Sequence, residues 1–413
     1  MTGQQFTILG QGWDADDPGL QAILARIYET NERPRCMCVP EGVEMYVALH
    51  RQFIVKCMPD TGGQHHPACV AFDAAPQQSG LGELVGEAIL ESQAGAVELR
   101  VDFPWARSVG RGVARAESQD VAEVAVPRRR MSLRALMHFL FERAGFNRWS
   151  PAMEGRRNQA VLHKYLLEAA QTMVVKGMPL ADRLYVPEPF HEADKAACAQ
   201  RRRSKLAVLH PKELQSPLAL VIGEFKASDE SPWGRRIWIK HMPDAPLLLA
   251  DKTWARIAKA YAPLFEARDA DGGQRVRLMM AALIRERREF TYEIDVASLM
   301  LTSEHWIPME GIHELPLVQA LVHARRRFIK PLRYDARHAA SFANALLIDV
   351  GERTVPLHIV SSHLDPKEQS AKATALKGGE DVWIWRTSED MPCLPSAVSI
   401  AALPRTVVDA GAS

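Results

Sequence analysis

The chain has 413 residues, a length that predicts two or three domains at roughly 150 residues each. Apolar residues make up 47% and charged residues 24%, which excludes disordered, collagen-like and coiled-coil proteins. No apolar run reaches the roughly 18 residues of a membrane span, and no secretory signal is visible at the N-terminus. The 51 basic and 50 acidic residues give a net charge of +1, so any contact with nucleic acid must depend on local charge. We therefore expect a soluble, cytoplasmic protein.

Near the N-terminus, four of the six cysteines lie close together beside two adjacent histidines. A chain of this size without an export signal has little use for disulfide bonds, so reduced thiols next to histidines indicate a metal site. Two strand-like runs in this segment, Met45–Leu49 and Phe53–Cys57, predict a hairpin with a short loop. A hairpin would bring the residues before it close to the residues after it.

The metal site that this arrangement predicts is a closed tetrahedral zinc site. Three thiolates and one imidazole complete such a site, and its role is structural because no coordination position is left for a substrate. We expect its ligands to be Cys36, Cys38, His65 and Cys69. His66 could replace His65, and Cys57 could replace a cysteine. The alternative is a set of buried free thiols, since a one-residue gap between cysteines is shorter than in typical zinc fingers.

The next feature is a helical region rich in arginine. Ser132 can cap a helix that runs to Ala144, and Gly145 can end it. A second helix is expected from about Arg156 to Lys176. Between Arg128 and Lys164, nine Lys or Arg residues stand against two Glu residues, a local charge of +7. Two basic helices and a tight turn are compatible with a helix-turn-helix-like unit on a phosphate backbone.

Candidate nucleic-acid contacts come from this region and from a second basic cluster near residue 330. In the helical region they are Arg128, Arg129, Arg130, Arg134, Arg148, Arg156, Arg157 and Lys164. In the second cluster they are Arg325, Arg326, Arg327, Lys330 and Arg333. Phe328 and Tyr334 could add base stacking there, and Arg201–Arg203 with Lys205 form a third basic group. The alternative is that these cations cover the core of the protein or pair with its acids.

From about Leu206 onward, strand-like and helical segments mix. Apolar runs that predict strands buried on both faces lie at Pro217–Ile222, Arg277–Ile284 and Phe290–Leu301. Lys252–Phe265 predicts a helix. Glu224 and Lys226 match the carboxylate–lysine half of a metal-dependent nuclease site, in which the carboxylate binds a divalent ion. No convincing aspartate precedes them, and the alternative is an ion pair at a strand end.

The last hundred residues predict the order helix, strand, strand, helix, strand. The segments are His313–Arg327, Asn344–Asp349, Val355–Val360, Pro366–Leu376 and Val382–Trp385. This order resembles the core of the restriction-endonuclease-like superfamily, whose small repair-type members carry Pro-Asp on one strand and Glu-x-Lys on the next. Here Asn344 replaces the aspartate, His358 the glutamate and Val360 the lysine. Without anionic oxygen ligands a Mg²⁺ site loses its main attraction, so we expect a catalytically inactive lobe.

A second resemblance extends over most of the chain. It rests on Arg33-Pro-Arg-Cys36-Met-Cys38, Met58-Pro-Asp-Thr-Gly62, Leu136-Met-His-Phe-Leu140, Phe146-Asn-Arg-Trp149, Gly223-Glu224, Trp306-Ile-Pro308 and Arg327-Phe-Ile-Lys330-Pro-Leu-Arg333-Tyr334. In order and spacing these motifs resemble domain of unknown function family 1173. Its members occur in bacteria, largely on integrative and conjugative elements and plasmids, which implies a place near DNA-transfer machinery. The family has no established activity, so the resemblance implies no reaction.

Together these patterns predict an α/β (α+β multidomain) protein of four parts. They are a zinc-ribbon-like hairpin module (1–75), a basic helical region (76–185), a mixed α/β region (186–310) and an endonuclease-like α/β lobe (311–413). No P-loop, dinucleotide-binding or nucleophile-elbow motif is present.

The expected function is zinc-stabilised, non-catalytic nucleic-acid binding that serves a bacterial mobile genetic element in DNA transfer or maintenance. DNA is favoured over RNA, and other mobile-element proteins are expected partners. One alternative is a metal-dependent nuclease that uses Glu224 and Lys226. Another is a protein-assembly factor that binds no nucleic acid.

Overall fold

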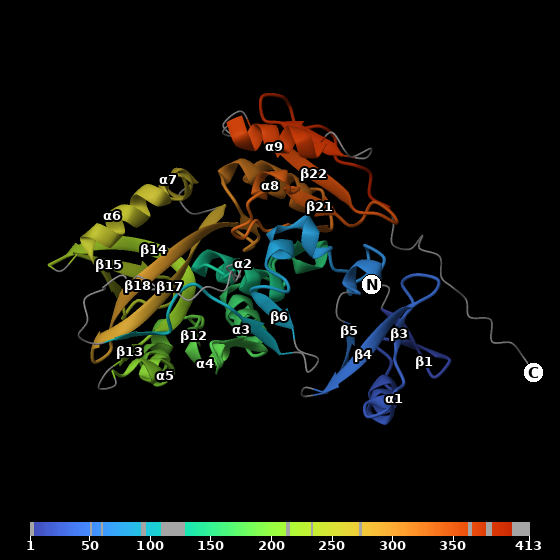
Figure 1. The fold of residues 1–413 in the computed structure, drawn as a ribbon, viewed down its shortest axis with the longest axis horizontal. Helices are drawn as coiled ribbons and strands as arrows, with labels where there is room; N and C mark the ends of the chain where they lie inside the picture. Colours follow the sequence, from blue (N-terminus) through green and yellow to red (C-terminus); the bar gives the residue numbers. More distant parts are fainter. Residues whose placement is uncertain are drawn as a thin grey trace, which may run out of the picture.

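The computed structural model describes residues 4–49, 52–58, 61–91, 96–108, 129–211, 215–232, 234–271, 275–361, 366–376 and 382–398. Figure 1 shows an N-terminal sheet at the right, helices at the centre, a group of long strands at the left and a C-terminal lobe at the top. The mixed α/β class that the sequence predicted is confirmed. No helix in these ranges has both the length and the apolar character needed to cross a membrane.

The N-terminal residues form a five-stranded antiparallel sheet with one helix. The order β2-β1-β3-β4-β5 joins β1 (Gln5–Ile8), β2 (Gln11–Asp14), β3 (Arg35–Cys36), β4 (Val43–Leu49) and β5 (Phe53–Cys57). The predicted hairpin is β4–β5, in which Met45 lies opposite Cys57. Helix α1 (Leu20–Ile27) buries Leu20, Leu24 and Ile27, whose spacing places them on one helical face.

The helical centre contains the predicted helix and a shorter second one. In α2 (Leu133–Arg143), the Ser132 side chain accepts a hydrogen bond from the Ala135 N–H at 3.1 Å, as its capping role requires. Helix α3 (Gln159–Ala170) starts after Asn158, which caps it in the same way. It ends before β10 (Met173–Val175), so the prediction of helix through Lys176 was wrong. The β-branched Val174 and Val175 favour this strand.

Helix α2 is a core helix, because eight of its eleven residues are buried. It packs between the barrel described below and a four-stranded sheet of order β11-β10-β7-β6. The remaining elements here are β6 (Ile89–Glu91), β7 (Val97–Leu99), β8 (Ala106–Ser108), β11 (Met178–Pro179), α4 (Leu180–Arg183), β12 (Leu184–Tyr185), α5 (Lys195–Leu206) and β13 (Gln215–Pro217). The central helices are thus covered on several sides rather than exposed as a pair.

Five strands at the left of Figure 1 close into a barrel. They are β14 (Ala219–Ser231), β15 (Gly234–Ile239), β16 (Leu247–Leu249), β17 (Val276–Arg288) and β18 (Thr291–Ser303). The order is β14-β15-β16-β18-β17, and β17 pairs again with β14. Among these five strands only β16 and β18 pair in parallel, and β12 also pairs in parallel with β14. Strand β14 reaches both neighbours because its first half pairs with β17 and its second half with β15, with a register shift between Phe225 and Ala227.

The connection from β16 to β17 consists of two helices, α6 (Asp251–Ala260) and α7 (Ala262–Asp271), instead of the single helix predicted over Lys252–Phe265. Pro263 explains the break, because proline lacks an N–H and is tolerated in the first turn of a helix but not in its interior. Strand β19 (Pro308–Met309) adds to the edge of β18.

The first half of β14 (Ala219–Phe225) and β17 from Leu278 to Ile284 are buried on both faces, as the continuous apolar runs in these segments predicted. Along β17, Leu278 and Met280 belong to the core inside the barrel. Met279 and Leu283, at the alternate positions, belong to the core around α2. The barrel and the central helices therefore share one wall.

The C-terminal lobe is a five-stranded sheet of order β23-β22-β21-β20-β9. Its elements are β9 (Arg148–Trp149), α8 (Leu315–His323), β20 (Phe328–Ile329), β21 (Ala345–Leu347), β22 (Val355–Val360), α9 (Pro366–Leu376) and β23 (Trp383–Arg386). Parallel strands β22 and β23 are joined through α9, and the other neighbours are antiparallel. The predicted order is present with one additional strand, β20, which sequence periodicity missed because it has only two residues.

We expect Leu278→Ala to destabilise the protein by about 2–5 kcal/mol, because it leaves a cavity inside the barrel where Leu278 is fully buried. The matched control is Val296→Ala on the neighbouring strand, where the side chain is 37% exposed and the loss should stay well below 1 kcal/mol. Denaturant unfolding of the three proteins measures both effects. Equal midpoints for Leu278→Ala and the wild type would contradict this account of the core.

Candidate metal centre and basic surfaces

Four predicted metal ligands lie at one end of the N-terminal sheet. Cys36 ends β3, and Cys38 lies in the turn that leads to β4. His65 and Cys69 follow β5, in a loop that closes where the Asp73 N–H donates to the Gly62 carbonyl at 3.0 Å. The β4–β5 hairpin therefore returns the chain as expected and brings the two pairs together.

The distances between the ligand atoms suit a tetrahedral metal site. The four atoms lie within 4.8 Å of one another. The Cys36 and Cys69 Sγ atoms are 3.8 Å apart, and the Nδ1 atom of His65 is 3.2 Å from Cys38 Sγ and 3.8 Å from Cys69 Sγ. Around zinc with bonds of about 2.3 Å to sulfur, tetrahedral ligand atoms are about 3.8 Å apart. The cluster is thus compatible with a bound metal ion.

Three of the sulfur atoms accept N–H donors from the protein. Gln4 Nε2 donates to Cys36 at 3.3 Å, the His66 N–H to Cys38 at 3.4 Å and the Ala71 N–H to Cys69 at 3.4 Å. Such donors stabilise negative charge on sulfur, the form in which cysteine binds metal. The surroundings of the cluster therefore favour thiolate ligands.

Cys57 and His66 lie outside this group of four. The Sγ atom of Cys57 is 3.6 Å from His65 Nε2, the ring nitrogen that faces away from the other ligands, and it donates to the Ala71 carbonyl at 3.2 Å. A partner on the second nitrogen fixes the orientation of a ligating imidazole. His66 Nδ1 accepts the Ala68 N–H at 3.1 Å. Cys57 is therefore placed to orient His65, and His66 to hold the turn.

The pKa values in the cluster show that its thiols and its imidazole interact strongly with one another. Burial lowers the pKa of His65, but its hydrogen bonds with Cys36, Cys38 and Cys57 outweigh burial and raise the pKa to about 11. Hydrogen bonds with Cys38 and Cys69 lower the pKa of Cys36, whereas hydrogen bonds with Cys36 and Cys38 raise the pKa of Cys69. Adjacent thiols cannot all ionise on their own, and a divalent ion would resolve this conflict.

We expect about one metal ion per chain, retained in Cys57→Ala and His66→Gln but lost in Cys38→Ala. The reason is that only Cys38 among these three supplies an atom to the four-atom group. Elemental analysis after dialysis measures the stoichiometry, and a metal indicator gives the affinity, which should fall about 10–100-fold in Cys57→Ala. Metal-free wild type, or loss of metal in His66→Gln, would contradict the assignment.

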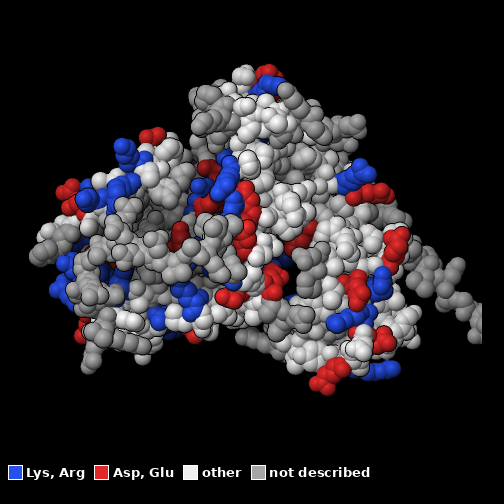
Figure 2. All heavy atoms as spheres, in the orientation of Figure 1, with Lys and Arg blue, Asp and Glu red and all other residues white. Residues whose placement is uncertain are grey.

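Five cations of the helical region are paired with acids, four of them with acids from other parts of the chain and Lys164 with an acid of its own helix. The pairs are Arg129–Glu83, Arg134–Glu310, Arg143–Glu91, Arg148–Asp73 and Lys164–Glu168. Arg157 instead donates to main-chain carbonyls, including those of Phe146 and His305, at 3.0–3.1 Å. Arg130 and Arg156 are exposed, and Arg128 lies outside the described residues. Figure 2 likewise shows basic and acidic side chains interspersed across the face in view.

The second basic cluster is partly buried. Arg326 is 5% exposed and donates to both carboxylate oxygens of Asp349, and Lys330 is 1% exposed and lies 2.9 Å from Glu314. A phosphate cannot reach either cation, so the prediction that they contact nucleic acid was wrong.

The other members of that cluster lie nearer the surface. Arg325 is exposed and pairs with Glu154, and Arg327 and Arg333 are half-buried. Phe328 and Tyr334 are buried, so their rings pack in the core and present no face on which a base could stack.

Glu224 has no free oxygen for a metal ion. Its carboxylate is buried and pairs with Lys240 and with Arg277, the latter at 3.2 Å. Lys226, two residues later, is exposed. Among the described residues, the cysteine–histidine cluster is the one group of three or more side chains placed to hold a metal. The geometry therefore gives no support to a nuclease site at Glu224.

Of the positions compared with endonuclease metal ligands, Asn344 lies in a buried polar network, whereas the Nδ1 atom of the buried His358 has no hydrogen-bond partner among the described residues. Asn344 donates to Glu314 at 2.7 Å, and its oxygen accepts from Lys372 at 2.9 Å. Lys330 completes the pairing of Glu314. Burial, with a further effect of Lys372, lowers the pKa of His358 to about 4, so this imidazole is neutral at pH 7. The Lys330 ammonium group thus neutralises the Glu314 carboxylate. The sequence did not reveal Glu314 and Lys372 as members of this network, because Glu314 lies just before α8 and Lys372 lies in α9, away from the strands of Asn344 and His358.

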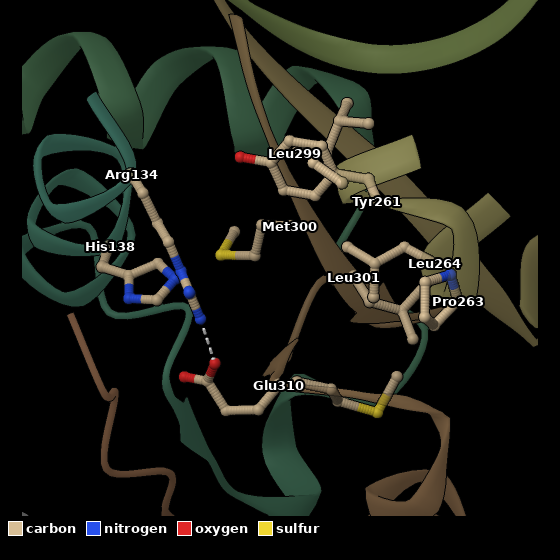
Figure 3. Close-up of a pocket in the computed structure, with 11 residues that line it drawn as sticks. Arg134, His138, Tyr261, Pro263, Leu264, Leu299, Met300, Leu301 and Glu310 are labelled. Carbon is tan, nitrogen blue, oxygen red and sulfur yellow. Dashed lines mark hydrogen bonds and ion pairs between the residues drawn. The ribbon is translucent and has the colours of Figure 1, made fainter. Parts of the chain in front are cut away.

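A cavity of about 240 Å³ lies between α2, β18 and the connection of α6 to α7 (Figure 3). Its wall combines apolar side chains, such as Leu299 and Leu301 from β18, with polar groups, and the Arg134–Glu310 ion pair closes one side. The volume is below the roughly 300–1,000 Å³ of typical small-molecule sites. Its principal charged groups are already paired, so we assign it no ligand.

His138, which lines this cavity, should make stability depend on pH. Burial lowers its pKa from 6.5 to about 4, and its Nδ1 atom accepts the Tyr334 N–H at 3.1 Å. The unfolded chain therefore binds more protons, so stability is complete above pH 6.5 and falls as the pH drops toward 4, by roughly 3 kcal/mol.

We expect His138→Gln to flatten this pH dependence, because glutamine can accept the same hydrogen bond without titrating. The control is His323→Gln, an exposed histidine that should leave the curve unchanged. Denaturant unfolding at pH 7, 5.5 and 4 measures the three curves. Parallel curves for His138→Gln and the wild type would refute the role of His138.

Comparison with known proteins gives one match. The family model described as "Protein of unknown function (DUF1173)" matches residues 6–388, which confirms the resemblance carried by the sequence motifs. No curated protein and no solved structure is similar enough to match.

Proposed function

The chain belongs to the DUF1173 family, and we propose that it is a zinc-stabilised, non-catalytic nucleic-acid-binding protein that serves a bacterial mobile element. The observation that carries this proposal is the five-stranded barrel. Five strands closed by the pairing of β14 with β17, with α6 and α7 between the third and fourth strands, resemble the OB-fold. Barrels of that kind bind oligonucleotides or oligosaccharides through their strands and connecting loops.

The absence of an acidic metal site from the described residues favours binding without catalysis. Phosphodiester hydrolysis with Mg²⁺ needs carboxylate oxygens around the ion. Glu224, the candidate carboxylate, pairs with Lys240 and Arg277, and the buried Glu314 beside Asn344 pairs with Lys330. We therefore rank nucleic-acid binding above the nuclease alternative.

Zinc is the metal that the donor set favours, because three thiolates and one imidazole form the usual closed zinc site. Its role would be to fix the loop that follows β5. Phe72, three residues after the ligand Cys69, packs against Ile329, Leu346 and Ile348 of the C-terminal lobe. Farther along, the Gly80 N–H donates to the Leu332 carbonyl at 2.9 Å, and a Cβ at Gly80 would lie 2.1 Å from the Arg333 oxygen. The ion would thereby anchor the N-terminal sheet to the lobe.

We expect the purified protein to retain DNA at 50 mM salt and to release it steeply by 200 mM, because phosphate contacts are weakened by counterion competition. Fluorescence anisotropy with single- and double-stranded DNA and RNA measures affinity and salt slope. The same DNA incubated with Mg²⁺ or Mn²⁺ should remain intact.

Two outcomes would favour the alternatives. Cutting that is lost both in Glu224→Ala and in Lys226→Gln would establish the nuclease. If the protein contains zinc but binds no nucleic acid even at low salt, the protein-assembly factor is the favoured alternative.

A further inference from the structure

Helix α5 is the most basic helix among the described residues, and it lies at one end of the β17–β18 pair (Figure 1). It carries five Lys or Arg residues and no acid. Arg202 is buried and pairs with Asp244, and Arg201 pairs with Glu188. Arg203 is exposed, and its guanidinium lies 4.6 Å from the centre of the Phe290 ring. This contact joins α5 to the turn between β17 and β18.

Phe290 is an exposed aromatic side chain in an unfavourable backbone conformation. It is 40% exposed, and its φ of 56° lies in the left-handed region that bulky residues rarely adopt. The buried Glu286 holds the turn by accepting the Phe290 N–H at 3.0 Å, and its other oxygen lies 2.7 Å from His210 Nδ1. A strained turn that is fixed by a buried carboxylate and presents an apolar ring to solvent indicates a function for the ring.

The cations around Phe290 differ from those cations of the central helices that pair with acids. Arg288, two residues before Phe290 in the sequence, is exposed. In the described part of the chain neither Arg203 nor Arg288 has a carboxylate partner. By contrast, Arg134, Arg143 and Arg148 each pair with an acid. Cations without acids are the ones available to phosphate groups.

We propose that the α5–hairpin surface, defined by Arg203, Arg288 and Phe290, binds single-stranded nucleic acid. Phe290 stacks on one base, and Arg203 and Arg288 contact the phosphates beside it. A single strand fits better than a duplex, because its bases are free to stack on an aromatic ring, and it fits better than an acidic peptide, which has no bases. The proposal rests on the proposed nucleic-acid-binding function and assigns its contact surface.

The test is fluorescence anisotropy of the full-length, metal-loaded protein with labelled 20-nucleotide oligo(dT) and oligo(U), a matched duplex, and polyglutamate as competitor. Phe290→Ala should weaken single-strand binding about 5–150-fold without changing the salt slope, for stacking worth about 1–3 kcal/mol per base. Phe290→Trp, which keeps an aromatic ring at this position, should bind the single strand as well as the wild type does. Arg288→Gln should weaken binding and reduce the salt slope by about one.

The chain offers a matched control in Tyr165, which is 42% exposed and has Lys164 5.1 Å above its ring. Tyr165→Ala should leave binding unchanged. Circular dichroism and metal content establish that each variant is folded.

Three results would overturn the proposal. Wild-type binding that is insensitive to Phe290→Ala and Arg288→Gln would refute this surface while leaving the proposed function intact. Duplex binding equal to single-strand binding, or displacement by polyglutamate at equal charge, would refute the single-strand assignment. Failure of the wild type to bind any of the nucleic acids would refute both this proposal and the proposed function.

Discussion

The burial of the apolar segments of β14 and β17 on both faces is the constraint on which the middle of the molecule depends. Alternate side chains of one strand, such as Leu278 and Met279, enter two different cores. Neither face can be left in water, so the barrel and the central helices must be assembled together. This requirement explains why α2 is a core helix even though its sequence contains arginines. Those arginines lie where the helix meets solvent and reach acids on neighbouring segments.

The pairing of charges across long sequence separations explains how a strongly basic segment can belong to an almost neutral protein. Arg134 pairs with Glu310, 176 positions away, and Arg148 with Asp73, 75 positions away. A local excess of positive charge in the sequence is therefore neutralised in space. The basic residues that matter for a polyanion are those that the fold leaves without acids, and α5 with the neighbouring hairpin provides two of them.

Features set by local sequence could be predicted, and features set by distant pairing could not. The cysteine–histidine cluster needed only a hairpin between its two halves, and Ser132 caps α2 because capping depends on the adjacent residues. The barrel depends on the pairing of β14 with β17 and of β16 with β18, which no local pattern reveals. Lys372 could not be connected with Asn344 from sequence, because a helix supplies it to a network of strand residues.

The close approach at Gly80 affects how independently the N-terminal sheet can move. Gly80 has no room for a side chain because its backbone lies against the Arg333 carbonyl. The segment that follows the metal cluster is therefore packed against the C-terminal lobe and does not form a free linker. Any repositioning of the N-terminal sheet would therefore have to carry the lobe with it or separate this backbone contact. A shortened protein that ends before residue 76 would retain the ligands but lose the surface against which their loop is held.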